Sequence, residues 1–414
     1  MKLGIRQNAA QFALLVTING LVGAMVGLER GVLPAAAEEV FGVEARSAIL
    51  SFILVFGVAK ALSNYAAGLL ADRWGRRRLL IAGWVVGVPV PFLLAMAPSW
   101  GWIIAANGLL GVSQGLAWSA TVIMKVDIAG PKQRGLAMGL NEAAGYLAVA
   151  GSAALAGYIS ASSGLFTAMY LGFAYTGFGL LLSVAFARET SGFLDVERRG
   201  HAAEAAAEAP ENLAWHVTVG EPTLSSAVQA GFFNNLNDGV AWGLFPLVYV
   251  AAGMSWVQIG WLAALYPAVW GFGQLGTGPL SDVWGRKPLL VAGMALQGLA
   301  IAAVVVADSF SGFAASAAAL GLGTAMVYPT LLAVMADVAA PSWRGRAIGI
   351  YRFWRDIGYA VGALGIGVTA DILGLDGAVS IVAGLTLLSG GWVAIRLKET
   401  AQVAGNLPGG AAKV

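Results

Sequence analysis

Three charged residues stand close together in an otherwise apolar segment near the C-terminal end of the chain, Tyr351-Arg-Phe-Trp-Arg-Asp-Ile-Gly-Tyr359. On a helix, Arg352 and Asp356 lie four positions apart on one face and can form an ion pair. Arg355 is then left without a partner. Because a guanidinium binds a carboxylate or phosphate through two parallel hydrogen bonds, an unmatched arginine in apolar surroundings predicts a site for an acidic solute.

Charged side chains also interrupt apolar stretches elsewhere in the chain. Glu29 and Arg30 are adjacent, Lys60 and Glu142 stand alone, and Asp238 follows a run of asparagines. A charge at the centre of a bilayer costs roughly 2.5–3.5 kcal/mol on insertion scales, so such residues usually face a cavity or a partner. A buried carboxyl group can also take up and release a proton. The candidates for that exchange are Asp238, Glu29, Glu142 and Asp356.

Residues that contact a solute are expected in the same segments. The candidates are Arg30, Lys60, Arg352, Arg355, Asn234, Asn237, Trp242 and Tyr328. A structural interpretation stands beside this one. Lys60, Asp356 and Glu29 would neutralise the arginines in an internal network, the asparagines would join helices through hydrogen bonds, and the aromatic residues would pack. Gly239 and Pro246 predict a bend in the helix that carries the asparagines.

The elements that must position these residues are membrane-spanning helices. Of the 414 residues, 58% are hydrophobic and 11% are charged, whereas about a quarter of a soluble domain is charged. About twelve apolar stretches are long enough to cross a ~30 Å hydrocarbon core as helices, and their length without two-residue alternation excludes barrel strands. They lie near 11–35, 47–71, 78–97, 100–124, 135–159, 164–187, 226–250, 256–280, 288–307, 310–335, 346–370 and 377–395.

The basic residues predict how the chain crosses the membrane. If the N-terminus is cytoplasmic, the loops of that face hold most lysines and arginines, while the opposite loops hold only Arg46 beside three glutamates. This distribution predicts a multi-pass protein of a bacterial-type inner (plasma) membrane with both termini in the cytoplasm. The first apolar run is too long for a removable signal peptide and is expected to be retained. With no cysteine and only His201 and His216, no metal site or cofactor is expected.

An internal repeat divides the chain into two similar halves. A shift of 210 positions places Gly68, Asp72 and Arg76 on Gly278, Asp282 and Arg286, and the Glu189-Thr190 pair on Glu399-Thr400. The expected domains are two six-helix bundles at 1–187 and 226–398, a cytoplasmic linker at 188–225 and a tail at 399–414. Parallel duplication of a six-helix unit predicts a solute site near the bilayer midplane, between halves that rock against each other. The same shift places Glu142 on Arg352, so the halves carry opposite charges where an inner gate would lie.

One loop carries a family signature. The segment Gly68-Leu-Leu-Ala-Asp72-Arg73-Trp-Gly75-Arg76-Arg77-Arg78 closely resembles the G-x-x-x-D-R-x-G-R-R-R motif of the major facilitator superfamily (MFS), and Gly278 to Pro288 is a degenerate copy with Val283 in place of the arginine. The resemblance implies twelve transmembrane helices in two pseudo-symmetric bundles and secondary active transport by alternating access. It also implies that spans two and eleven are neighbours, so that Lys60 approaches Arg352 and Arg355 in a cationic patch that an anion would neutralise.

The motif also implies a conformational latch at the cytoplasmic side. In the family such contacts form when that side is closed and break when it opens. The latch candidates are Gly68, Asp72, Arg73, Gly75, Arg76, Asp282, Arg286, Arg134 and Arg344. Physically, Asp72 could meet the positive N-terminal end of a neighbouring helix, or an arginine such as Arg344 or Arg346. The alternative is that these arginines only fix the topology.

The sequence therefore predicts a monomeric transporter, and not an enzyme, that moves a small organic solute, with an anion favoured, together with protons or against a counter-substrate. The partners are the solute and the lipid bilayer, with no nucleic acid. The alternative is a proton-coupled exporter of drugs or toxic metabolites. Exporters often carry G-x-x-x-G-P-x-x-G-G in span five, whereas this chain reads Gly145-Tyr-Leu-Ala-Val-Ala-Gly151, without the proline. Two further protein classes are disfavoured. A membrane enzyme would need a nucleophile cluster, and a sensor would need a signalling domain, and the sequence shows neither.

Overall fold

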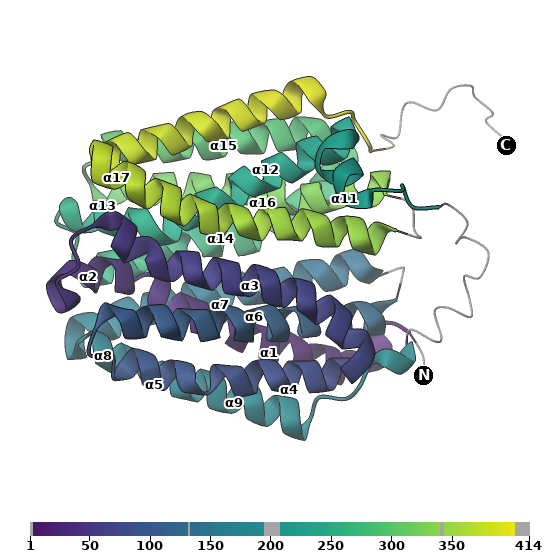
Figure 1. Cartoon of the computed structure of the whole chain (residues 1–414), viewed down its shortest axis with the longest axis horizontal. Coiled ribbons are helices and arrows are strands. Elements are labelled where there is room, and N and C mark those ends of the chain that lie inside the picture. The colour runs from purple at the N-terminus through teal and green to yellow at the C-terminus, as the bar shows by residue number, and fades with distance from the viewer. Residues whose placement is uncertain (1–2, 131–132, 194–207, 340–342, 402–414) are drawn as a thin grey trace.

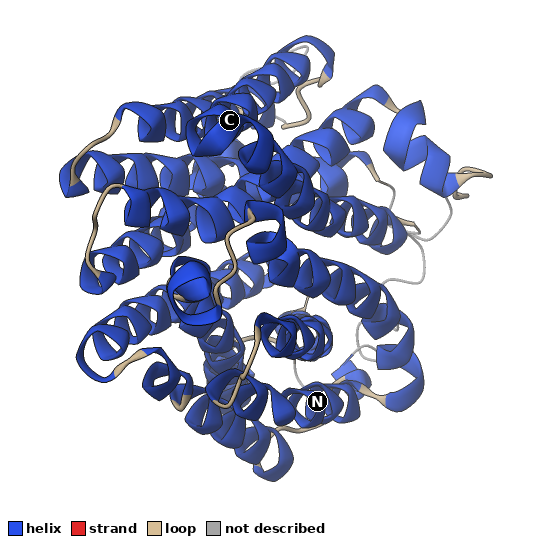
Figure 2. Cartoon of the chain, turned by 60° about the vertical axis from the view of Figure 1, so that its left-hand side comes forward, coloured by secondary structure: helices blue, strands red, loops and turns tan. Residues whose placement is uncertain are grey.

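The computed structural model describes residues 3–130, 133–193, 208–339 and 343–401, and the side chains of Gly68, Leu69, Asp72, Arg134, Gly135, Arg344 and Gly345 lie outside that description. Within the described ranges every regular element is a helix (Figure 2). This confirms the prediction of an all-helical protein, which rested on apolar runs without two-residue alternation.

In its described residues the first half contains the helices α1 to α9 after a short 3₁₀ turn. They are α1 (Ala9–Arg30), α2 (Leu33–Phe41), α3 (Arg46–Trp74), α4 (Arg76–Gly87), α5 (Pro89–Ala95), α6 (Trp100–Ala129), α7 (Arg134–Ser163), α8 (Leu165–Met169) and α9 (Leu171–Ala185). Pro34 and Pro89 stand in the first turns of α2 and α5, where a proline needs no backbone donor.

The second half begins with two short elements and continues with longer helices. They are α11 (Leu213–Trp215), the π-helical turn η3 (His216–Gly220), α12 (Pro222–Gly239), the π-helical turn η4 (Val240–Leu244), α13 (Phe245–Ala251), α14 (Trp256–Trp284), α15 (Arg286–Val306), α16 (Phe310–Val338) and α17 (Arg344–Arg396). The turn η4 directly follows Gly239, while the predicted bend in this helix stays a prediction.

Nine helices in the described ranges are long and apolar enough to cross a membrane. The last of them, within α17, turns back at Gly374, where φ is 76° and ψ is 175°. The segments α12–α13 and α14, predicted as spans seven and eight, are not among the nine. The structure thus confirms a helical membrane protein in two bundles, while the count of twelve spans stays a prediction.

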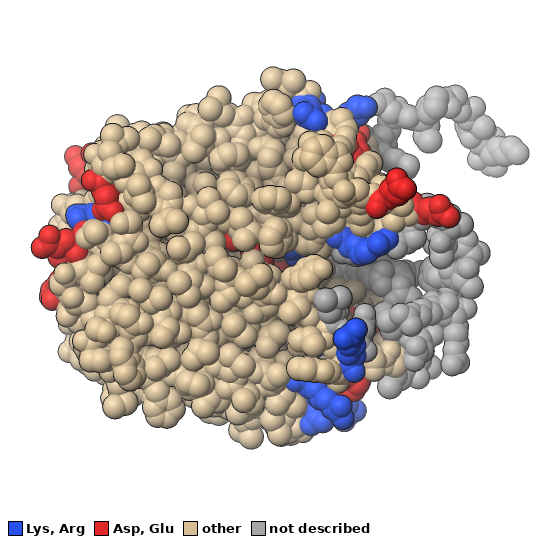
Figure 3. All heavy atoms as spheres, in the orientation of Figure 1, with Lys and Arg blue, Asp and Glu red and all other residues tan. Residues whose placement is uncertain are grey.

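The helices lie side by side along the longest axis of the molecule (Figure 1). The first half forms one bundle and the second half the other, and the described part of the chain begins and finishes at the same end of the molecule (Figure 1). We call this the terminal end and the opposite one, where α2, α8 and α13 lie, the distal end. Most lysines and arginines on the visible surface lie at the terminal end, and the belt between the ends is almost free of charge (Figure 3).

Two helix pairs make most of the contacts between the described parts of the two halves. Helix α3 packs on α17, and α7 packs on α14. At the distal end α7 and α14 approach so closely that a Cβ atom on Gly157 would lie 2.7 Å from the Cα atom of Gly260. Nearby, Asp371 of α17 accepts hydrogen bonds from the backbone N–H groups of Arg46 and Ser47, the first residues of α3, at 2.5 and 3.0 Å. The distal end is therefore closed.

The repeat is visible in the contacts of the terminal end. Arg76 donates from Nε to Asp127 Oδ2 at 3.2 Å, and Arg286 makes the equivalent bond to Asp337 at the same distance. Thr190 and Thr400, again 210 positions apart, donate to these two aspartates at 2.9 Å. The duplication predicted from the residue spacing therefore extends to side-chain contacts.

The predicted latch residues divide into two groups. Arg76, Asp282 and Arg286 are described, and their ion pairs link elements of the same half, including Arg286 with Asp282 at 2.5 Å. Arg73 is exposed, and Gly75 has φ 86°, which lets the chain turn between α3 and α4. The side chains of Asp72, Arg134, Arg344 and Gly68 lie outside the description, so the latch stays a prediction.

Candidate functional site

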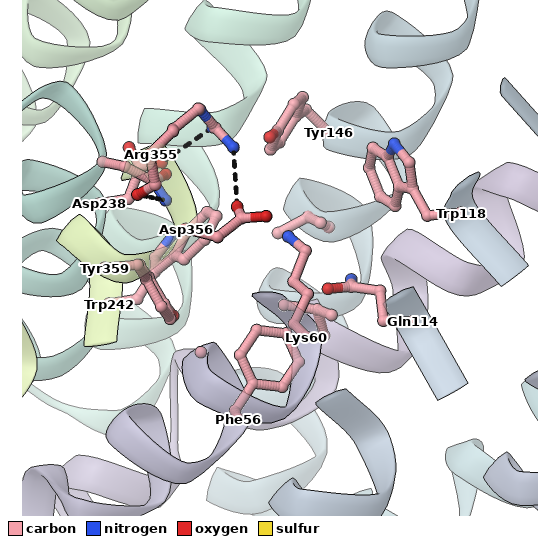
Figure 4. A pocket seen from close by; sticks show the side chains of 14 residues that line it. Phe56, Lys60, Gln114, Trp118, Tyr146, Asp238, Trp242, Arg355, Asp356 and Tyr359 are labelled. Carbon is pink, nitrogen blue, oxygen red and sulfur yellow. Dashed lines mark hydrogen bonds and ion pairs between the residues drawn. The ribbon is translucent and has the colours of Figure 1, made fainter. Parts of the chain in front are cut away.

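A cavity lies between the two bundles at the contact of α3 with α17. About 30 Å³ of it is open to water, which is room for water molecules and not for an organic solute in this conformation. The lining residues come from both halves: Val26, Phe56, Gly57, Lys60, Gln114, Trp118, Tyr146 and Val149 from the first, and Asn235, Asp238, Trp242, Arg355, Asp356 and Tyr359 from the second. The charged ones face each other across the cavity (Figure 4).

Arg355 lies between two carboxylates. Its Nη2 atom is 3.6 Å from Asp238 Oδ2 and its Nη1 atom is 3.4 Å from Asp356 Oδ1. The guanidinium also lies over the ring of Tyr328, 4.4 Å from the ring centroid. All three charged residues are at most 6% exposed, so this is a buried ion-pair network.

Neighbouring side chains hold the two carboxylates in place. The Tyr266 hydroxyl donates to Asp238 Oδ1, and Asn64 Nδ2 donates to Asp356 Oδ2 at 2.7 Å. Because Asn64 belongs to α3, its bond to Asp356 joins the halves. Asn235 fixes the backbone of the arginine by donating to the Arg355 carbonyl oxygen at 2.8 Å.

Lys60 differs from the other charged residues of the cavity. Its ammonium group lies 5.8 Å from the ring centroid of Phe56 and 6.0 Å from that of Trp118. No carboxylate oxygen of the described residues lies within 4 Å of it, and the side chain is half-buried. Lys60 is thus the cation of this cavity that has no ion-pair partner in the described part of the chain.

The expected pair of Arg352 with Asp356 is wrong. Asp356 instead contacts Arg355, its neighbour in sequence, and Arg352 is half-buried outside the cavity lining. The i,i+4 rule describes the surface of one isolated helix, whereas here Arg355 is drawn inward by Asp238 of α12 as well. The expected cationic patch of Arg355 and Lys60 carries no net charge, because Asp238 and Asp356 lie in the same cavity and match the two cations in number.

Four other candidates are not among the residues that line this cavity. Gln297 of α15 donates to Asn234 Oδ1 at 3.0 Å and accepts from Asn237 Nδ2 at 2.9 Å, while Asn234 Nδ2 has no hydrogen-bond partner in the described part of the chain. Glu29 and Arg30 form a buried pair with 3.5 Å between Oε1 and Nη1. Neither pair is part of the cavity lining.

Glu142 has neutral partners in the described part of the chain. Trp118 donates from Nε1 to its Oε1 at 3.3 Å, and Asn141 donates to the same oxygen at 2.9 Å. It is 4% exposed and lies outside the cavity lining, so its role in proton exchange stays a prediction.

Several residues of the site were not predicted from the sequence. Gln114, Tyr146 and Tyr359 line the cavity, and Tyr266 and Asn64 orient its carboxylates. Tyr146 also stacks on Trp270 across the interface, with ring centroids 3.6 Å apart. Aromatic and amide side chains are frequent in membrane helices, so their residue types alone did not mark them as part of a site. A search for polar residues one helical turn from a buried charge would have identified Asn64, which lies four positions after Lys60.

The comparisons with known proteins agree with this architecture. The model of the Major Facilitator Superfamily matches residues 12–235 and again 227–412, which is nearly the whole chain in two parts. The chain belongs to the Major Facilitator Superfamily. As a member of this family it is a membrane transporter, and its cavity lies between the two bundles that the family model matches.

Two bacterial relatives are similar over part of their length. One is the 3-(3-hydroxy-phenyl)propionate transporter of Escherichia coli strain K12, 31% identical over 110 residues, which are 27% of this chain and 26% of the relative. The other is the multidrug resistance protein MdtH of Aeromonas hydrophila, 32% identical over 114 residues, which are 26% of this chain and 29% of the relative. The chain thus matches between a quarter and a third of each.

A solved structure is similar over the whole chain. The human organic anion transporter MFSD10 (TETRAN) superposes with a TM-score of 0.68 and 18% sequence identity, over 93% of this chain and 99% of that one. At this identity the similarity concerns the fold.

Proposed function

We propose that this MFS transporter moves a small organic acid across a bacterial inner membrane, with both termini in the cytoplasm, and that Lys60 holds the carboxylate of the solute. The observation that carries the proposal is the ammonium of Lys60, which has no ion-pair partner in the described part of the chain and lies near the rings of Phe56 and Trp118 in the cavity wall. An ammonium in low dielectric attracts an anion strongly, and the rings of Phe56, Trp118 and Tyr146 offer apolar surface to an unsaturated or aromatic body.

Charge balance supports coupling to protons. Arg355 and Lys60 are matched in number by Asp238 and Asp356, so an incoming carboxylate adds one negative charge to a buried site. One proton taken up by Asp238 or Asp356 restores neutrality. Solute and proton would then cross together, and the two aspartates are the proton-coupling residues of this proposal.

The similar proteins point in the same direction. One relative is named a transporter of a phenylpropionate, which is an aromatic carboxylate, and the superposed structure is named an organic anion transporter. The MdtH relative favours the alternative, export of a lipophilic drug. A carboxylate probe and its uncharged amide distinguish the two.

The experiment measures binding of 3-phenylpropionate and of 3-phenylpropionamide to the purified protein in nanodiscs, for wild type and Lys60→Met. Loss of one desolvated charge-assisted contact should weaken binding of the acid by roughly 10- to 100-fold, since each 1.4 kcal/mol is tenfold. The amide should bind weakly to both proteins. If both compounds bind equally well and Lys60→Met binds them unchanged, the acid proposal is wrong and the exporter alternative gains support.

A further inference from the structure

A second cationic group lies close to the cavity but outside its lining. Arg30, at the distal end of α1, is 1% exposed. Its Nε, Nη1 and Nη2 atoms have no hydrogen-bond partner in the described part of the chain. It contacts Glu29, at 3.5 Å from Nη1, and the rings of Phe52 and Phe56, with centroids 4.9 and 4.4 Å from its Cζ atom.

A buried guanidinium with five N–H donors and no hydrogen bond is costly, so the site must offer a compensating partner in some state of the protein. Glu29 supplies charge but not a hydrogen bond to Arg30, because its Oε1 atom also lacks a hydrogen-bond partner in the described ranges. Its other oxygen accepts from Asn107 Nδ2 at 3.0 Å. Arg30 and Glu29 therefore form an ion pair without a hydrogen bond, and the guanidinium donors and Glu29 Oε1 have no hydrogen-bond partner in the described part of the chain.

Phe56 connects this pair with the central cavity. Its ring lies 4.4 Å from the Arg30 guanidinium and 5.8 Å from the Lys60 ammonium, so the two cations are separated by no more than the sum of these distances. Tyr359 of α17 lies next to the same ring, 6.0 Å between centroids, and its buried hydroxyl has no described hydrogen-bond partner. Tyr359 also interacts electrostatically with Arg30, Glu29 and Asp238.

We propose that Arg30 is a second anion site at the distal end of the pathway, which takes the solute carboxylate in exchange for Glu29. When Glu29 binds a proton it no longer neutralises Arg30, and the carboxylate takes its place on the guanidinium. When the carboxylate leaves across Phe56 towards Lys60, Glu29 releases its proton and pairs with Arg30 again. The site holds one cation and one anion in both states, so charge is conserved.

The groups that face Glu29 define its pH dependence. They are Arg30 on the same helix, Asn107 on α6 and Tyr359 on α17. Asn107 does not titrate, so the competition is between the proton, Arg30 and the solute. Binding at this site should therefore strengthen as pH falls. This inference rests on the proposed transport of an organic acid, but it concerns different residues from those of the central cavity.

The test measures binding of 3-phenylpropionate to the full-length protein in nanodiscs between pH 5.5 and 8. The Lys60→Met background isolates the second site. In that background Glu29→Gln, which imitates the protonated residue, should raise affinity at pH 7.5 by roughly 5- to 150-fold, the usual range of coupling between linked equilibria. It should also remove the pH dependence. Arg30→Met should abolish this residual binding, and Glu39→Gln, an exposed distal glutamate, should change nothing.

The outcomes separate the two proposals. If Lys60→Met has no effect in an otherwise wild-type protein, the central site is wrong, whatever Arg30 does. If Lys60→Met weakens binding but Glu29→Gln changes neither the residual affinity nor its pH dependence, Arg30 and Glu29 are a structural pair and the second site is wrong. Glu29→Gln removes a charge without changing volume, so this result does not depend on whether Arg30→Met folds.

Discussion

At the scale of single residues, the network around Arg355 explains why charges can remain inside this membrane protein. Asp238, Asp356 and Arg355 each have a counter-ion or a hydrogen-bond partner on a helix other than their own. Such a network contributes less to stability than its number of contacts suggests, because burial costs each ion its hydration. Removing only one member of the network should lower stability strongly, because the remaining charge is left buried and unpaired.

Arg355→Met should therefore destabilise the protein strongly. It leaves Asp238 and Asp356 buried without their common counter-ion, a loss of about 3–5 kcal/mol for a broken buried pair. The measurement is the free energy of unfolding in detergent, by denaturant titration. Adding Asp356→Asn to Arg355→Met should recover part of the loss, because one uncompensated charge is removed. If the double variant is no more stable than Arg355→Met, the charges are not the cause.

Sequence reasoning located the charged residues of the site but not their partners. Lys60, Arg355, Asp238 and Asp356 stood out because a charge in an apolar run is rare and expensive. The pairing of Asp356 was wrong, since a helix-surface rule cannot represent a carboxylate on another helix. Tyr146 and Tyr359 could not be predicted, because an aromatic residue in a membrane helix is equally at home against lipid, in a packed core or beside a solute.

At the scale of elements, the distal end is closed by a helix terminus. The first N–H groups of a helix have no partner within it and carry a partial positive charge. At α3 the carboxylate of Asp371 accepts two of them and also the Ser47 hydroxyl, although it belongs to α17 of the other half. A cap that is supplied by another bundle is present only while the two bundles are together at this end.

Asp371→Ala should therefore shift the protein towards a conformation that is open at the distal end. The chain has no cysteine, so Leu50→Cys provides a single reporter; Leu50 is 0% exposed and lies against Gly243 of the second half. The rate of maleimide labelling should rise several-fold, as expected when about 1 kcal/mol of capping is lost. Asp376→Ala, an exposed aspartate of the same helix, serves as the control. Equal rates in all three proteins would show that Asp371 does not hold this end.

Helix boundaries were harder to predict than helix existence. The first span was expected to run to residue 35, whereas α1 ends at Arg30 and α2 begins at Leu33. The expected third span is divided into α4 and α5 at Pro89. In both places the hydropathy remains high across the break, and the signal in the sequence is the proline in the first turn of the new helix, Pro34 or Pro89. Glycine and a nearby proline predicted a bend at Gly239, and the structure has a π-helical turn directly after this residue.

At the scale of the whole molecule, the duplicated unit governs the terminal end. Glu189, after α9, accepts hydrogen bonds from the backbone N–H groups of Arg76 and Arg77 at the start of α4. Glu399, after α17, does the same for Arg286 and Lys287 at the start of α15. In each half, a glutamate that follows the last helix thus accepts hydrogen bonds from the start of an earlier helix, and the two glutamates are equivalent in the repeat. The residue shift of 210 predicted this equivalence, whereas the closed distal end depends on contacts between halves that no repeat can reveal.

These two glutamates should make stability depend on pH. Partial burial alone would raise the pKa of each carboxyl, but the surrounding backbone N–H donors outweigh it and hold the pKa of Glu189 and Glu399 below the ordinary value of 4.5. A lowered pKa means that the folded state favours the ionised form. The stability that these contacts contribute is therefore complete above pH 4.5 and is lost as pH falls through the lower folded-state values.

The measurement is the melting temperature in detergent between pH 7 and pH 3, for wild type and for the double variant Glu189→Gln with Glu399→Gln. The variant should melt at a lower temperature at pH 7, because an amide oxygen accepts these hydrogen bonds less strongly than a carboxylate. The difference between the two proteins should shrink below pH 4.5, where the wild-type carboxyls become protonated and lose the same advantage. Glu208→Gln, on an exposed residue before α11, should follow the wild type at every pH. If the difference stays constant across this range, ionisation of the two glutamates does not stabilise the terminal end, and the equivalence of the halves there is one of geometry alone.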